Sequence, residues 1–118
     1  MTISSFRDLE AWRSAHQLVL LVYQTTQEFP IEERFGLTQQ MRRSAVSVPA
    51  NIAEGFKRRG IQDKIRFYNI AEGSLEELKY YFILSTDLRY PSSSEWNILA
   101  DNVGRLLNGL IQSTTRRR

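Results

Sequence analysis

The hydrophobic residues of this chain recur every three or four positions almost throughout, and strict alternation never lasts for more than a few residues. This periodicity predicts an all-α protein. A first helix is expected from about Phe6 to Glu28, because Pro30 stops it. Its main apolar stripe comprises Leu9, Trp12, His16, Val19 and Tyr23.

A second apolar stripe lies about 110° around this helix from the first. It comprises Ala11, Ala15, Leu18 and Val22. A helix with two apolar stripes needs two surfaces to bury them. We therefore expect the second stripe to form an interface between copies of the chain.

Three further helices are predicted. The second is expected from about Gly36 to Lys57, and Pro49 should kink it or restart it. The third is expected from about Ile61 to Leu88, with an apolar arc that covers more than half of its circumference. The fourth is expected to open with a capping box, in which Ser92 binds the N3 amide and Glu95 reaches back.

Four amphipathic helices with short connections predict one domain over residues 1–118, folded as an antiparallel up-down-up-down four-helix bundle. Only a basic tail at about residues 114–118 is expected to be disordered. The excess apolar surface of the first and third helices predicts a self-associating bundle, that is, a homo-oligomer.

Two segments, residues 44–55 and 69–77, carry small and polar residues where an ordinary helix would carry leucines. Buried polar groups must be paired, so we expect a polar seam of interhelical hydrogen bonds that sets the helix register. Ala53, Gly55, Ala71 and Gly73 would allow the close contact. The expected seam residues are Ser47, Asn51, Glu54, Glu72, Ser74 and Glu77. No nucleophile with a neighbouring base is evident, so no catalytic residue is predicted.

Charge is distributed unevenly along the chain, although its net value is only +3. Residues 42–66 carry +5 and residues 102–118 carry +4, whereas residues 1–41 carry −2 and residues 67–101 carry −4. Such asymmetry is typical of proteins with a polyanionic partner. The candidate nucleic-acid-binding residues are Arg42, Arg43, Lys57, Arg58, Arg59, Lys64 and Arg66.

Phosphate contacts from these residues would give little sequence readout, and we favour Arg43, Lys57, Arg58 and Arg59 for them. The aromatic residues occupy core positions, so no base-stacking platform is expected. The alternative is that the basic residues form solvated faces that pair with acidic segments, dock an acidic protein partner or close a ring of subunits.

Several classes of protein are excluded by composition. The chain has no cysteine, so disulfide frameworks, thiolate metal sites and cysteine nucleophiles are excluded. Its longest apolar stretch, Leu18 to Tyr23, is too short for a membrane span. No export signal is visible, so a cytoplasmic protein is expected. His16 is the only histidine; we expect it to be buried and hydrogen-bonded, with no metal and no cofactor.

Several residues of the predicted helices together carry a family resemblance. They are Asp8-Leu9, Trp12, Phe29-Pro30, Glu33, Gly36-Leu37, Gln40, Arg42-Arg43-Ser44, Ser47, the segment 49–55 (Pro-Ala-Asn-Ile-Ala-Glu-Gly) and the segment 70–77 (Ile-Ala-Glu-Gly-Ser-Leu-Glu-Glu). In these residues the chain resembles the four-helix-bundle proteins encoded by intervening sequences in bacterial 23S ribosomal RNA genes. One departure is Gly60, where the family more often has a serine that would cap the third helix.

The resemblance implies a four-helix subunit, and related bundles assemble as ring-shaped pentamers. A kindred group includes the accessory protein of diversity-generating retroelements, which binds nucleic acid and a reverse transcriptase. The chain is therefore expected to be a non-enzymatic oligomer, with a pentamer favoured, that binds RNA or DNA through a basic surface assembled by oligomerisation. The alternative is a scaffold for protein–protein interaction that binds no nucleic acid.

Overall fold

A computed structural model describes residues 2–117, and these residues fold entirely as helices and connections, with no strand. The all-α prediction is therefore confirmed. These residues form four long helices, and a short 3-10 helix precedes each of the first two. In chain order the elements are η1 (Phe6–Asp8), α1 (Glu10–Thr26), η2 (Ile31–Glu33), α2 (Leu37–Lys57), α3 (Ile61–Asp87) and α4 (Glu95–Thr115).

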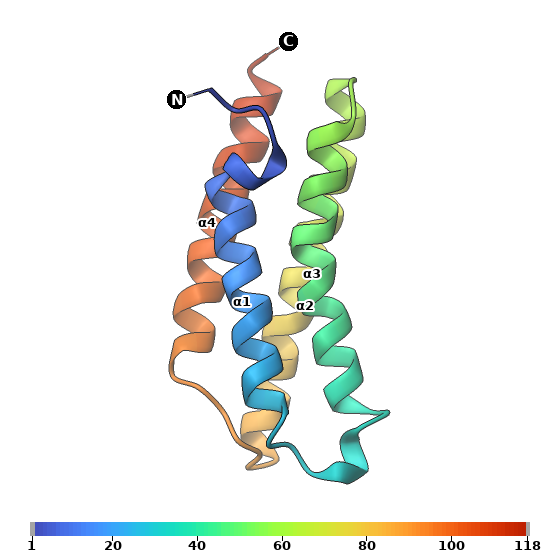
Figure 1. Cartoon of the computed structure of the whole chain (residues 1–118), viewed down its shortest axis with the longest axis vertical. Coiled ribbons are helices and arrows are strands. Elements are labelled where there is room, and N and C mark those ends of the chain that lie inside the picture. The colour runs from blue at the N-terminus through green and yellow to red at the C-terminus, as the bar shows by residue number, and fades with distance from the viewer. Residues whose placement is uncertain (1, 118) are drawn as a thin grey trace.

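The four long helices lie side by side in one elongated bundle of 48 × 24 × 20 Å. In Figure 1 the chain descends along α1, returns along α2, descends along α3 and returns along α4. Each helix packs against two neighbours, because α1 contacts α2 and α4, and α3 contacts the same two helices. Within residues 2–117, no helix is long and apolar enough to cross a membrane.

The core lies along the axis of this bundle and draws on all four helices. Its largest fully buried side chains include Trp96, Tyr68 and Phe82. The rings of Phe82 and Trp96 stack with their centroids 4.5 Å apart, which joins α3 to α4.

The second apolar stripe of α1 belongs to this core, so its prediction as an oligomer interface is wrong. Its exposed fractions within a single subunit are 4% for Ala11, 1% for Ala15, 1% for Leu18 and 0% for Val22. The physical reason is the ring of contacts: α1 packs against both α2 and α4 of its own chain, and it therefore needs two apolar stripes. In the main stripe, by contrast, Tyr23 is 39% exposed.

Helix starts differ from the prediction at two places. The first helix is divided, because Leu9 is extended between η1 and α1. A capping box does form there, with the Ser5 side chain and Asp8 satisfying backbone amides reciprocally. The predicted box at Ser92 is wrong, because α4 begins only at Glu95, whose amide donates to the Ser93 hydroxyl at 3.1 Å.

Two other local predictions are corrected. The helix α2 continues as one element through Pro49, so a restart at that residue is wrong. The tail is helical further than expected, because α4 ends at Thr115, and the buried Thr114 hydroxyl donates to Leu110 O at 2.8 Å. Of the predicted disordered tail, Arg118 lies outside the described residues.

The lower end of the bundle in Figure 1, where the α1–α2 and α3–α4 connections meet, is held together by Glu33. One carboxylate oxygen accepts the Leu37 amide at 3.0 Å at the start of α2. The other accepts the Tyr90 hydroxyl at 2.8 Å. A Cβ on Gly36 would lie 2.8 Å from the Glu33 carboxylate, so glycine leaves room for this cap.

We expect Tyr90→Phe to lower the melting temperature by a few degrees at pH 7. Two hydrogen bonds lower the pKa of Glu33 below its ordinary value of 4.5: the larger effect comes from the Leu37 amide and the smaller from the Tyr90 hydroxyl. A lowered pKa stabilises the fold above pH 4.5, and this contribution is lost as the pH falls through the folded value. The difference between the variant and the original chain should therefore shrink in melts at pH 3, followed by circular dichroism.

Tyr80→Phe is the control, because Tyr80 is 57% exposed and its hydroxyl makes no hydrogen bond to another residue of the described part of the chain. It should melt like the original chain at both pH values. Equal melting of the Tyr90 and Tyr80 variants at pH 7 would contradict a stabilising role for the Glu33 contact.

Candidate nucleic-acid interface

Most of the predicted basic residues lie at one end of the bundle. Figure 1 shows the turn between α2 and α3 at the same end as both termini of the chain. Burial has the largest effect on the pKa of Lys64, which it lowers, and on the pKa of Tyr68, which it raises. The positive charge of Arg117 acts to lower the pKa of both groups, so Arg117 lies near the first turns of α3. We call this surface the basic end; it comprises Lys57, Arg58, Arg59, Lys64, Arg66, Arg116 and Arg117.

Two arginines of the basic end are partly neutralised by carboxylates three or four residues before them in the sequence. Arg58 pairs with Glu54 at 2.8 Å, and Arg66 pairs with Asp63 at 3.3 Å. Both guanidinium carbons also lie 4.7 Å from the centroid of the Phe67 ring. Arg58 and Arg66 are therefore held against Phe67, and their positions are set by local contacts.

Lys64 has an internal task. Its ammonium donates to Phe56 O at 2.7 Å and to Gly55 O at 3.3 Å, which satisfies carbonyl groups at the C-terminus of α2. Burial, and then the positive charge of Arg117, lower the pKa of Lys64. Arg66 is exposed but paired with Asp63. The exposed cations of this end that form no ion pair within residues 2–117 are Lys57, Arg59, Arg116 and Arg117.

Arg42 and Arg43 do not join the basic end. Lys57 lies fourteen positions after Arg43, which is about 21 Å along a helix at 1.5 Å per residue. The Arg42 side chain donates to the Thr26 hydroxyl at 2.9 Å and to Tyr23 O at 3.3 Å, so it joins α2 to α1. The predicted set is thus divided between two places on α2.

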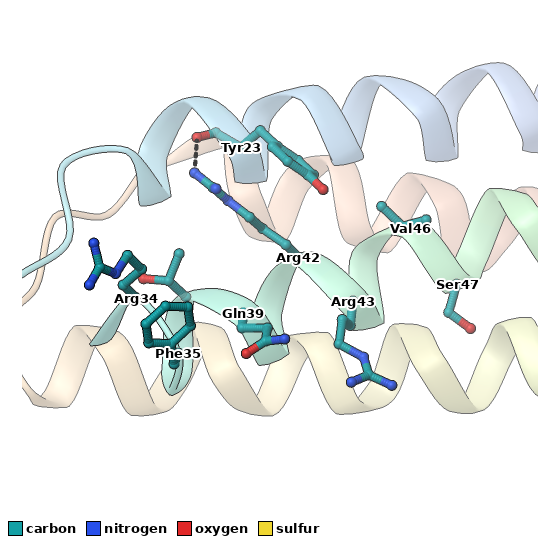
Figure 2. Close-up of a pocket in the computed structure, with 9 residues that line it drawn as sticks. Tyr23, Arg34, Phe35, Gln39, Arg42, Arg43, Val46 and Ser47 are labelled. Atoms are coloured by element: carbon teal, nitrogen blue, oxygen red, sulfur yellow. Dashed lines mark hydrogen bonds between the residues drawn. The ribbon is translucent and has the colours of Figure 1, made fainter. Parts of the chain in front are cut away.

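The second place is a pocket of about 480 Å³ over the first half of α2. Figure 2 shows Arg42 reaching to Tyr23 on α1 and Arg43 extending from α2 in the opposite direction. Phe35 lies at one end of it, beside Arg34. We call it the Phe35 pocket; its lining residues are Tyr23, Arg34, Phe35, Thr38, Gln39, Arg42, Arg43, Val46 and Ser47.

Sequence reasoning missed Phe35. The aromatic residues were expected at core positions, but the Phe35 side chain is 77% exposed. It lies in the connection between η2 and α2, outside any helical stripe. The available signal was its position between Arg34 and Gly36, beyond the periodic pattern.

The predicted polar seam forms only in part. The hydroxyl groups of Ser47 and Ser74 lie 2.7 Å apart between α2 and α3, and Asn51 donates to the Ser47 hydroxyl at 3.0 Å. Glu54 and Glu77 are exposed instead and pair within their own helices, Glu54 with Arg58 and Glu77 with the Tyr81 hydroxyl at 2.7 Å.

Glu72 is half-buried and makes no hydrogen bond or ion pair within residues 2–117. The predicted close contact between α2 and α3 is confirmed at Gly55, where a Cβ would lie 2.5 Å from Tyr68 Cε1. It is absent at Gly73, where a Cβ would meet no atom of the described chain within 4 Å.

The comparison with known families agrees with the resemblance. The family described as 23S rRNA-intervening sequence protein matches residues 7–112. The chain belongs to this family. No curated protein matches the chain.

Several residues that carry the family resemblance have structural tasks here. Glu33 caps α2, Asn51 holds Ser47 in the polar seam, and Gly55 lets Tyr68 approach α2. Family membership therefore accounts for the fold through these residues. The exposed basic end and the Phe35 pocket are the two candidate binding surfaces that the basic residues form.

His16 offers little chemistry of its own. It is half-buried rather than buried, and its ring stacks on Trp12 with centroids 5.2 Å apart. The prediction that it is buried and hydrogen-bonded is wrong, because its side chain makes no hydrogen bond within residues 2–117. Over the same residues, no group of three metal-ligating side chains comes together.

Proposed function

We propose that this protein is a non-enzymatic, self-associating nucleic-acid-binding protein that contacts phosphate groups through its basic end. The observation that carries the proposal is the gathering of seven cationic residues from the end of α2, the α2–α3 turn, the start of α3 and the C-terminus at one end of the bundle. Only Glu54 and Asp63 form ion pairs with them in the described chain. A surface with this excess of positive charge favours a polyanion.

Lys57 and Arg59 are the strongest candidates for phosphate contacts. Both are exposed, and none of the ion pairs within residues 2–117 involves either of them. Contacts of this kind bind the backbone of RNA or DNA and carry little sequence information. Binding should therefore depend steeply on salt, since each neutralised phosphate releases condensed counterions.

Self-association is supported by apolar side chains that one subunit leaves in contact with solvent. On α3 and α4 they include Tyr80, Ile83 and Ile98, which are 57%, 60% and 70% exposed. A second copy of the chain would cover such residues. The family resemblance implies five copies, and a ring of basic ends would multiply a weak affinity.

The test is an anisotropy titration of Lys57→Gln/Arg59→Gln with labelled duplex DNA and structured RNA. If the two residues each contact a phosphate, the slope of log affinity against log salt should fall by about two. Affinity at low salt should fall about tenfold for both nucleic acids. The mass by light scattering should stay that of the original chain.

Lys79→Gln/Arg89→Gln is the matched control, because it removes the same charge far from the basic end. Lys79 pairs with Glu76 and Asp101 on the side of the bundle, and Arg89 follows α3 at the opposite end. An equal loss of affinity in both double variants would contradict a localised site. No binding by the original chain at low salt would favour a scaffold for protein partners instead.

A further inference from the structure

The Phe35 pocket carries positive charge that nothing in its lining compensates. Arg34, Arg42 and Arg43 line it, and no carboxylate does. None of these arginines takes part in an ion pair within residues 2–117. The acceptors that Arg42 does have, the Thr26 hydroxyl and Tyr23 O, are neutral. The pocket therefore favours an anionic occupant.

The same pocket offers an exposed aromatic surface. Phe35 is 77% exposed, and the Arg34 guanidinium carbon lies 4.7 Å from the centroid of its ring. Tyr23 is 39% exposed and carries the Arg42 guanidinium 4.5 Å from its ring centroid. Aromatic rings and arginine planes are the surfaces on which unpaired bases stack. An occupant that satisfies both features is a planar aromatic group joined to an anion.

Size and polar lining fit the same chemistry. A volume of about 480 Å³ lies within the range of about 300–1,000 Å³ of small-molecule sites. Figure 2 shows the Gln39 amide between Phe35 and Arg43, where it can donate to and accept from the edge of a base. Thr38 adds a hydroxyl group to the lining, whereas the Ser47 hydroxyl is already bonded to Ser74 and Asn51 in the polar seam.

We propose that the Phe35 pocket binds one unpaired nucleotide, with its base stacked on Phe35 and its phosphate contacted by Arg34 and Arg43. Where the nucleotide is part of a strand, this proposal rests on the proposed function. It adds that the protein binds single strands in preference to duplex. A duplex cannot present a base to this pocket without breaking a pair, whereas the basic end contacts only phosphates.

The two surfaces are close enough for one strand. Arg43 at the pocket and Lys57 at the basic end are about 21 Å apart along α2. At about 3.4 Å per nucleotide, some six nucleotides cover this path. A labelled 12-nucleotide single strand is therefore long enough to contact both surfaces, and a 12-base-pair duplex is the matching probe for phosphate contacts alone.

The test compares Phe35→Ala with the original chain by anisotropy titration with both probes. Loss of base stacking should weaken binding of the single strand about tenfold or more. Duplex binding should change less than twofold. Phe35→Trp should restore single-strand binding, and its added indole fluorescence should be quenched by the strand. Ile31→Ala is the control, because Ile31 lies in η2, four residues before Phe35, and is 73% exposed but does not line the pocket.

The outcomes separate this proposal from the proposed function. Lys57→Gln/Arg59→Gln should weaken both probes, whereas Phe35→Ala should weaken only the single strand. Equal single-strand binding by Phe35→Ala and the original chain overturns the pocket as a base site. A change in the mass of Phe35→Ala by light scattering also overturns it, because the pocket would then be a contact between copies.

A free nucleotide is the second source of this ligand chemistry. If the original chain binds neither strand nor duplex at low salt, the proposed function fails. Adenosine 5′-monophosphate is then titrated into Phe35→Trp while indole fluorescence is recorded. Saturable quenching supports the pocket as a site for a free nucleotide, and no quenching overturns it.

Discussion

Replacing Leu18 with alanine is expected to destabilise the folded subunit by about 2–5 kcal/mol, the usual cost of removing a buried leucine side chain. Leu18 is 1% exposed within a single subunit, where α1 packs against α2 and α4. The loss of stability has two parts: the favourable free energy of transferring the removed atoms out of water is lost, and the cavity left behind costs additional free energy. Urea unfolding followed by circular dichroism measures it, at two protein concentrations because association would add to apparent stability.

Leu20→Ala is the matched control, since the same substitution two residues away removes a side chain that is 50% exposed. Its effect should stay within about 0.5 kcal/mol. Leu18→Ala could instead have the same free energy of unfolding as Leu20→Ala and form a smaller assembly by light scattering. That result would show that the second stripe of α1 is an interface between copies.

The two stripes of α1 show what periodicity can and cannot predict. Helix angles place Leu18 and Val22 on a different stripe from Val19, and α1 does pack against two other helices. They do not say whether both surfaces come from the same chain. That depends on how many helices surround α1, and in a closed ring of four each helix has two neighbours.

Helix boundaries show a similar limit. The pattern of a serine followed three residues later by a carboxylate occurs at both Ser5 and Ser92. Only the first forms a capping box. Three consecutive serines precede Glu95, and the start of α4 falls after Ser94, where the chain arrives from α3. The N-cap of α4, Ser94, makes no side-chain cap hydrogen bond. The serine–carboxylate spacing alone therefore does not decide whether a capping box forms.

The candidate site was predictable in composition but not in arrangement. The basic residues of segment 42–66 were identified from charge, yet helix geometry places Arg43 about 21 Å from Lys57. The approach of Arg117 to Lys64 depends on α4 returning to the α2–α3 turn, which no local pattern reveals. Phe35 escaped notice because it belongs to no helical stripe.

The close contact between α2 and α3 leads to the second large expected effect. Gly55→Ala should destabilise the protein by about 1–3 kcal/mol, the cost of overpacking a filled site. The new Cβ would lie 2.5 Å from Tyr68 Cε1 and 3.1 Å from Lys64 O. Tyr68 is only 2% exposed, so its ring has no free space to enter. Thermal melting measures the loss.

Gly73→Ala should have the opposite sign. A Cβ at Gly73 meets nothing within 4 Å, and alanine is favoured over glycine in a helix by about 0.5–1 kcal/mol. Both glycines lie in helices and both belong to segments that sequence alone treats as equivalent. A melting temperature raised by Gly73→Ala and lowered by Gly55→Ala would locate the helix contact at Tyr68. Two equal increases would contradict it, because the ring of Tyr68 would then have moved aside without cost.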